Sequence, residues 1–239
     1  MSKFRSLALG ATLALAAIGS AQAQAWPQRP IALVVPQAAG NSPDILARVL
    51  ADKLSRSLGQ QVYVENRTGA ANIVGTQAVA RATPDGYTFL FATSASLSTN
   101  PHTFRKLPYD PQKDLMPVAM VARSHHVLLV NPSLPFKSLE DLIAQEKAKP
   151  GEITLAVDSE RNISGLIGQT INRRAGIKMV LVPYAAAANS IQDTIAGRVQ
   201  ATIQSASVAE PFIKEATLRP LAVAGTKRLA SLPGIPAIA

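Results

Sequence analysis

The clearest structural signal in the chain lies in residues 31–59, which read IALVVPQAAGNSPDILARVLADKLSRSLG. The first five of these residues are apolar and mostly β-branched, which indicates a buried strand. Ser42-Pro43-Asp44 is typical of a helix start, because serine is a good N-cap and proline fits the first helical position. Leucine then recurs at every fourth position from Leu46 to Leu58, and Gly59 closes the helix. The segment therefore predicts a strand, a loop and an amphipathic helix.

The same alternation of strand-like and helical segments continues through the rest of the chain. We expect further strands at residues 62–65, 87–92, 118–122, 127–130, 153–157, 179–182, 199–204 and 221–224. We expect helices to begin near Asn72, Ser138, Ser164 and Asn189, with Ser138 and Asp141 forming a capping box. Strands separated by helices of this length imply parallel sheets with right-handed crossovers. The sequence thus predicts the α/β class with mostly parallel sheets.

The N-terminus has the pattern of a secretory signal peptide. A short basic start precedes an apolar run from Ser6 to Ile18, and small residues then recur at the positions where cleavage occurs. We expect residues 1–25 to be removed by cleavage near Ala23 or Ala25. The alternative is an uncleaved N-terminal anchor, but the apolar run is short for a membrane span.

Composition narrows the possible partners. The chain carries a net charge of +9 and contains no cysteine, which excludes disulfides and a lipid-modified cysteine. A basic excess is compatible with nucleic acid, an anionic membrane or an acidic ligand. Because the basic residues are scattered and the protein is predicted to be exported, we expect no nucleic-acid partner.

Three predicted strand-to-helix junctions carry small and hydroxyl residues, at 36–42, 93–96 and 158–164. In open parallel sheets, ligands bind beyond the carboxyl ends of the strands and against helix N-termini. Free N–H groups in a first helical turn bind anions without a basic side chain. These junctions favour a carboxylate ligand held in a cleft. The alternative interpretation is that they are ordinary turns and helix caps.

The residues offer little evidence of catalysis. His102, His125 and His126 are the only histidines, and no acidic pair accompanies them at metal-ligand spacing. The glycines fit no nucleotide-binding motif, and no nucleophile elbow is present. We therefore expect no metal, no cofactor and no catalytic residue. Counting residues does not exclude a Ser–His–Asp triad, so a secreted hydrolase of small esters or amides stays the alternative from another class.

An ordered set of short motifs extends the argument over nearly the whole mature chain. These motifs lie at residues 30–40, 44–48, 64–70, 84–88, 107–111, 130–135, 182–184 and 221–223. Together they resemble the receptors of the tripartite tricarboxylate transporter family, also called Bug proteins. Each motif is modestly specific, whereas the ordered set is highly specific.

The resemblance implies a periplasmic solute-binding receptor and not an enzyme. It implies a two-domain periplasmic-binding-protein fold, type II-like, with a ligand cleft between the domains. On this basis residues 26–123 form a first domain, residues 124–220 a second, and residues 221–239 return to the first. The expected ligand is a small organic acid or amino acid, and the expected partners are membrane transporter subunits. A sensor protein is the alternative partner, and the receptor itself is expected to be monomeric.

The resemblance also implies a set of ligand contacts by position. In the first domain these are Ala38, Ala39, Gly40, Ser42, Asp44, Ser94 and Ser96. In the second domain they are Asn162, Ser164, Gly165 and Tyr184.

The chain departs from the family pattern inside this proposed site. Asn41 stands where a second glycine is usual, and Gln204 stands where an aspartate is frequent. Asp158 and Glu160 add negative charge, while Arg161 offers a partner for a ligand carboxylate. These departures favour a ligand that carries an amino or hydroxyl group beside its carboxylate.

The end of the sequence also differs from what the resemblance implies. Residues 232–236 resemble a motif that normally precedes several more strands and helices. We therefore expect a fragment or a truncated product, in which the first domain exposes apolar surface.

Overall fold

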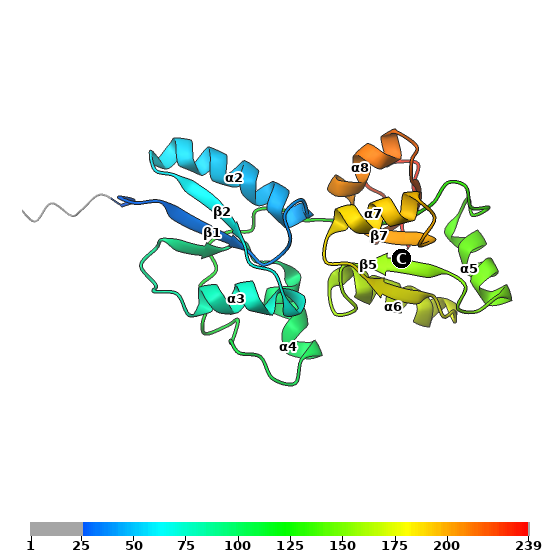
Figure 1. Ribbon diagram of the computed structural model, residues 1–239, viewed down its shortest axis with the longest axis horizontal. Helices are drawn as coiled ribbons and strands as arrows, with labels where there is room; N and C mark the ends of the chain where they lie inside the picture. The colour runs from blue at the N-terminus through cyan, green and yellow to red at the C-terminus, as the bar shows by residue number, and fades with distance from the viewer. Residues whose placement is uncertain (1–25, 239) are drawn as a thin grey trace, which may run out of the picture.

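The computed structural model of this 239-residue chain describes residues 26–238. These residues form two lobes, each built around its own β-sheet (Figure 1). The predicted signal peptide and its cleavage positions, Ala23 and Ala25, lie outside the described residues. Each helix in residues 26–238 is too short or too polar to span a lipid bilayer.

The first lobe is centred on a parallel sheet of three strands in the order β2-β1-β3. The strands are β1 (Ile31–Val35), β2 (Val62–Asn66) and β3 (Thr88–Leu90). All residues of β1 are buried, as expected for a central strand that is apolar on both faces. Helices α2 (Ser42–Leu58) and α3 (Ile73–Ala80) lie on opposite faces of the sheet (Figure 1). The chain crosses from β1 to β2 through α2 and then runs back past β1 to β3 through α3, so right-handed crossovers in opposite directions place the two helices on opposite faces.

Helix α2 confirms the predicted leucine pattern, with a correction at its start. Its leucines pack on the sheet and are partly buried: Leu50, Leu54 and Leu58. Gly59 ends the helix in the left-handed region, with φ of 66°. Asn41 occupies the N-cap position, whereas Ser42, the predicted cap, is the first helical residue. The Ser42 hydroxyl is therefore available for contacts outside the helix.

The rest of the first lobe contains short helical segments, η2 (Ala70–Asn72), η3 (Ala95–Thr99) and α4 (Asn100–Thr103). Asn72 precedes α3 as predicted, but its side chain does not cap the helix. It donates instead to Thr93 Oγ1 at 2.8 Å, which ties this segment to the residues after β3.

The second lobe is centred on a five-stranded sheet in the order β6-β5-β7-β4-β8. Its strands are β4 (His126–Val130), β5 (Thr154–Val157), β6 (Val180–Pro183), β7 (Ala201–Ser205) and β8 (Arg219–Ala224). Strand β5 is parallel to β6 and β7, as predicted, whereas β4 is antiparallel to β7 and β8. Parallel pairing thus holds on the half of the sheet where helices connect the strands.

Four helices accompany this sheet: α5 (Leu139–Ala148), α6 (Ile163–Ala175), α7 (Ala187–Ile195) and α8 (Ala206–Lys214). The predicted capping box at α5 is confirmed, since Asp141 N–H donates to Ser138 Oγ and Ser138 N–H donates to Asp141 Oδ2. At α7 the N-cap is Ala186, and the predicted cap Asn189 lies inside the helix. Pro211 interrupts the helical pattern of α8, a helix that the sequence did not predict.

Two expectations about the connections need correction. Residues 118–122 were expected to form a strand, but they form none, and Val118 and Met120 are 75% and 72% exposed. The expected return of residues 221–239 to the first domain is not seen in the described residues. Strand β8 pairs with β4, and Leu229, Leu232 and Ile235 pack against the core of the second lobe.

Candidate ligand-binding cleft

A cavity of about 1920 Å³ runs between the lobes and continues along the sheet of the first lobe. All three predicted strand-to-helix junctions contribute to its wall. The first supplies Asn41 and Ser42, the second Ser94, and the third Asp158. The carboxyl ends of the strands therefore face one space from both lobes, as expected for a ligand site in an α/β fold.

The first junction reaches across the cleft to two helices of the second lobe. The backbone N–H of Ala187, the first residue of α7, donates to Asn41 Oδ1 at 3.0 Å. The hydroxyls of Ser42 and Ser207 lie 3.1 Å apart, and Ser207 is in the first turn of α8. An acceptor from the first lobe thus occupies the N-terminus of α7, where partial positive charge favours it.

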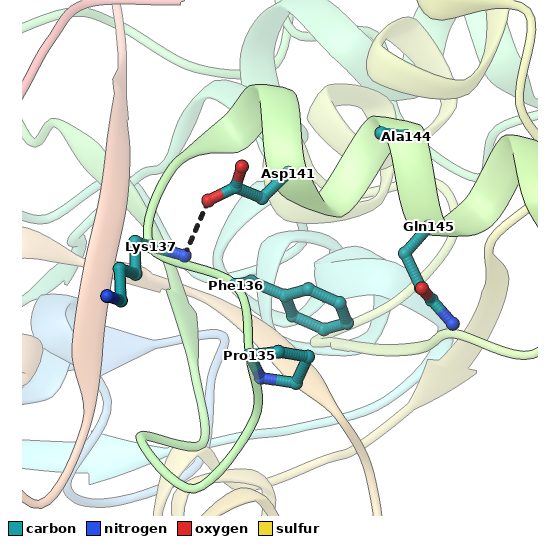
Figure 2. A pocket seen from close by; sticks show the side chains of 6 residues that line it. All are labelled: Pro135, Phe136, Lys137, Asp141, Ala144 and Gln145. Carbon is teal, nitrogen blue, oxygen red and sulfur yellow. Dashed lines mark hydrogen bonds between the residues drawn. The ribbon is translucent and has the colours of Figure 1, made fainter.

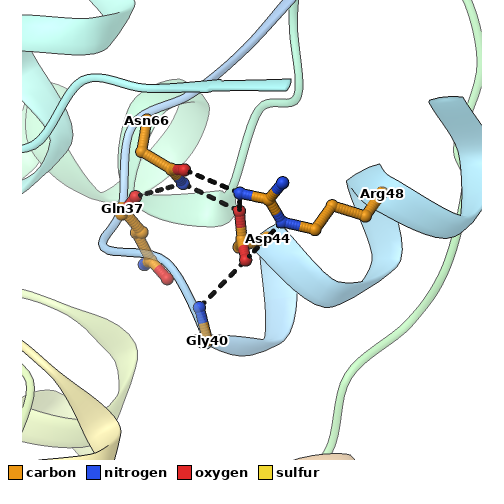
Figure 3. A network of polar contacts seen from close by, with 5 residues as sticks. All are labelled: Gln37, Gly40, Asp44, Arg48 and Asn66. Atoms are coloured by element: carbon orange, nitrogen blue, oxygen red, sulfur yellow. Dashed lines mark hydrogen bonds and ion pairs between the residues drawn. The ribbon is translucent and has the colours of Figure 1, made fainter. Parts of the chain in front are cut away.

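Asp44 shapes the first junction (Figure 3). Its Oδ2 accepts from Gly40 N–H at 2.9 Å, and its Oδ1 accepts from Asn66 Nδ2 at 2.9 Å. Arg48 Nε donates to the same carboxylate at 3.0 Å. Burial acts to raise the pKa of Asp44, but these hydrogen bonds outweigh it and hold the pKa below its usual value. Asp44 is only 2% exposed within this network, so it organises the loop.

The loop residues predicted as contacts lie outside the cavity wall. Ala38 is partly buried and Ala39 is exposed, and Asn41 N–H donates back to Ala38 O at 3.3 Å. Gly40 has φ of 81°, which a side chain rarely tolerates, and its amide is bonded to Asp44. These residues set the course of the loop that presents Asn41 and Ser42.

The two predicted serines of the second junction have different environments. Ser94 is exposed and lines the cavity. Ser96 is fully buried, and its Oγ accepts from Thr76 Oγ1 at 2.8 Å while its carbonyl accepts from Tyr109 OH at 2.9 Å. Of the two, only Ser94 is placed to contact a ligand.

The third junction is a loop folded tightly onto the start of α6. Asn162 is the N-cap, and Ser164 Oγ accepts from Asp158 N–H at 3.0 Å, so the predicted cap Ser164 holds the loop instead. A Cβ at Gly165 would lie 2.6 Å from Glu160 Cα, and glycine is therefore required for this close approach. Ser164 and Gly165 are both buried.

Asp158 is the charged residue of this junction that faces the cavity. Burial raises its pKa to about 6, although the hydroxyl of Ser164 acts in the opposite direction. Within residues 26–238 it forms no ion pair. Asn162 Oδ1, at the same junction, is buried and accepts no hydrogen bond from the described residues.

Arg161 does not lie where a ligand carboxylate was expected. Its Nη1 donates to the carbonyl of Thr103 at 3.0 Å, and its guanidinium lies 4.5 Å from the centroid of the Phe104 ring. Both partners belong to the first lobe. Arg161 therefore bridges the two lobes.

Tyr184 lies outside the cavity wall. Its hydroxyl donates to Asp193 Oδ2 at 2.8 Å, and this bond raises the pKa of Tyr184. Asp193 also pairs with Arg198 at 2.7 Å. These contacts give Tyr184 a structural role in the second lobe.

Gln204 is the main cavity residue that the sequence did not assign to the site, although its departure from the family pattern drew attention to it. It is 3% exposed and lines the cavity, and its Nε2 donates to Ser190 Oγ at 2.8 Å and to Thr202 Oγ1 at 3.0 Å. With its donors engaged, Gln204 presents its carbonyl oxygen as an acceptor.

The histidines show no metal-binding or catalytic arrangement in the part of the chain that the structure describes. His125 and His126 line the cavity, but no cluster of three metal-ligating side chains occurs among residues 26–238. Burial lowers the pKa of His126 to about 4, with a smaller contribution from His125, so the ring is neutral at pH 7.

A separate hollow of about 540 Å³ lies beside the start of α5 (Figure 2). Asp141 is its only acidic lining residue, and Lys137 N–H donates to Asp141 Oδ2 at 2.9 Å. The same carboxylate forms the capping box of α5, so it is already engaged. The cleft between the lobes is therefore the better candidate for a ligand site.

Comparison with known proteins identifies the family. A family model described as "Tripartite tricarboxylate transporter family receptor" matches residues 46–239. This chain belongs to that family. A UPF0065 protein of Bordetella bronchiseptica is 38% identical over 234 residues, which cover 98% of this chain and 69% of the relative. Protein BugT of Bordetella pertussis is 37% identical over 242 residues, covering 100% of this receptor and 74% of BugT.

Solved structures agree with this assignment. Rpa4515 of R. palustris, solved with adipate, matches with a TM-score of 0.86 and 34% identity over 90% of this receptor and 72% of that chain. MatC of Rhodopseudomonas palustris, solved with bound malate, matches with a TM-score of 0.80 and 26% identity over 89% of this receptor and 72% of MatC. The predicted periplasmic-binding-protein fold is confirmed, and the protein is a solute-binding receptor of the periplasmic type.

Proposed function

We propose that this receptor captures a small organic acid in the cleft between its lobes and delivers it unchanged to the membrane subunits of a transporter. The observation that carries the proposal is the contact between Ala187 N–H and Asn41 Oδ1. It indicates that the N-terminus of α7 faces the opposite lobe and takes an oxygen acceptor there. A ligand carboxylate is an acceptor of the same kind with a full negative charge. The adipate and malate bound by two similar receptors support the same ligand class.

Of the predicted contacts, we assign direct roles to Ser42 and Ser94, because both line the cavity and carry hydroxyls. The backbone amide of Ala187 completes this proposed set of donors. The remaining predicted residues shape the loops that hold these groups. Neutral donors of this kind bind a carboxylate without a permanent ion pair, which suits a receptor that must release its ligand.

The proposed role includes no catalysis. A hydrolase of this residue set would need a histidine within hydrogen-bond reach of a serine. In residues 26–238 no histidine side chain is hydrogen-bonded to a serine. The family match to transporter receptors also favours binding over turnover.

A thermal-shift and calorimetry screen tests the function. We expect at least one mono-, di- or tricarboxylate to raise the melting temperature, because a ligand at a hundred times its Kd stabilises the native state by about 2.7 kcal/mol. The corresponding uncharged amides should have no effect. Ser94→Ala should weaken binding of that acid by about 1 kcal/mol, the usual value for a lost hydrogen bond. Stabilisation by amides and acids alike, or by no acid at all, would contradict the proposal.

A further inference from the structure

The end of the second-lobe sheet that faces the cleft is rich in hydrogen-bond acceptors. Strands β5 and β7 are parallel, with Ala156 beside Thr202. Two residues further along each chain come Asp158 and Gln204, and both line the cavity. Because side chains two residues apart lie on the same side of a strand, this register carries the two acceptors to the same end of the sheet.

The charge of Asp158 has no partner within the described protein. The arginine of its own loop, Arg161, is turned away toward Thr103 and the Phe104 ring. Elsewhere in residues 26–238, no lysine or arginine is within ion-pair distance of the Asp158 carboxylate. An enclosed carboxylate without a counter-charge is costly, and a bound cation removes that cost.

Asn162 supplies a second, independent observation at the same junction. It is 6% exposed, and its Oδ1 accepts no hydrogen bond from the described residues. Asn162 is next in sequence to Ile163, which lines the cavity. Buried polar atoms are nearly always paired, so the unpaired oxygen of Asn162 indicates a donor supplied from outside the described residues. Gln204 adds an acceptor, because its Nε2 is committed to Ser190 and Thr202.

We propose that Asp158 is a specificity-determining residue that binds a protonated amine on the ligand. The ligand is then an amino acid or a similar molecule that carries an ammonium group beside its carboxylate. The carboxylate faces the N-terminus of α7 and the hydroxyls of Ser42 and Ser94, and the ammonium faces Asp158. This inference rests on the proposed function, since it assigns the second end of the same ligand.

Matched pairs of ligands test the assignment on the whole protein by calorimetry. The pairs are aspartate with succinate and glutamate with glutarate, which differ only by the amino group. We expect the wild-type receptor to prefer the amino member of the pair that it binds, by about 10- to 100-fold, as a charge-assisted hydrogen bond provides. Asp158→Asn should remove this preference by weakening the binding of the amino member more than that of the plain dicarboxylate.

Glu160→Gln is the control. Glu160 lies two residues after Asp158, is exposed and does not line the cavity, so the substitution removes the same charge outside the proposed site. We expect it to keep the wild-type preference. A wild-type receptor that prefers the plain dicarboxylate overturns the role of Asp158 but leaves the proposed function standing. An Asp158→Asn variant that loses the same amount of affinity for both ligands of the pair also overturns the role of Asp158. If no carboxylate of either kind binds, the proposed function fails together with this inference.

Discussion

The two lobes are built from the same strand–helix units, yet they bury their apolar residues to different degrees. In the second lobe Leu128, Leu155 and Ile203 are at most 1% exposed. In the first lobe Leu54 and Phe89 are only partly buried, although both pack against the buried residues of the central strand β1. The second sheet has five strands and the first has three, within the residues that the structure describes.

This difference shows what a periodic pattern determines and what it leaves open. The leucines of α2 recur at the spacing of one helical face, so the helix and its inward face follow from the sequence. How deeply that face is buried depends on how many layers surround it. In the first lobe part of this face borders the cavity, together with the exposed segment around Met116 and Val118.

The largest expected effect comes from truncating one core leucine in each lobe. Leu155→Ala should lower the free energy of unfolding by about 2 to 5 kcal/mol, because the residue is fully buried and leaves a cavity. Leu54→Ala should cost about 1 kcal/mol, since part of its surface is already accessible and only part of the transfer free energy is lost.

Urea unfolding followed by two probes separates the lobes. Trp26 is the single tryptophan of the chain and its ring centroid lies 6.2 Å from that of Tyr87, so its fluorescence reports on the first lobe. Far-ultraviolet circular dichroism reports on both lobes. Equal losses of stability from the two substitutions would mean that the lobes are equally well packed, against the structure.

The next effect in size is the pH dependence of the second lobe, where two groups act in opposite directions. The pKa of Asp158 is raised from 3.8 to about 6, so its contribution favours folding below pH 4 and is lost as the pH rises through 6. The pKa of His126 is lowered from 6.5 to about 4, so its contribution is present above pH 6.5 and is lost as the pH falls through 4. Each contribution is on the order of 3 kcal/mol, because one pKa unit corresponds to about 1.36 kcal/mol.

These two contributions should nearly cancel in the wild-type protein between about pH 4 and pH 6. Asp158→Asn removes the first, so stability should then rise steeply with pH over this range. His126→Gln removes the second, and stability should instead fall as the pH rises. Unfolding free energies measured at several pH values give the slopes, and a variant as flat as the wild type would refute the assignment for that residue.

Much of the fold follows from local sequence, whereas most of the site does not. The spacing of leucines, the capping box at Ser138 and the left-handed Gly59 are all encoded within a few residues, and the structure confirms them. Helix α8 was missed because Pro211 disrupts its pattern. Residues 118–122 have strand-like composition but no pairing partner, and composition alone does not provide one.

The polar residues of the site show why sequence reasoning stops short there. The three junctions that small and hydroxyl residues marked as a candidate ligand site all contribute to the cavity wall. The same reasoning did not separate Ser94, which faces the cavity, from Ser96, which is buried against Thr76. Which way a polar side chain points depends on partners far along the chain. The bond between Asn41 and Ala187, for example, joins residues that are 146 positions apart.

That bond gives the smallest expected effect and tests how the two lobes meet. Asn41→Gly removes the oxygen that accepts from Ala187 N–H, and we expect a loss of about 1 kcal/mol from the contact between the lobes. Small-angle scattering should show a larger radius of gyration in the absence of ligand, because fewer bonds then hold the cleft closed.

Ser133→Ala is the control, since Ser133 bonds only to Asn131 within the second lobe. If the added organic acid carries its own carboxylate to α7, it should restore the wild-type dimension in Asn41→Gly. An expanded form that persists with saturating acid would mean that the Asn41 side chain, and not the ligand, closes the lobes.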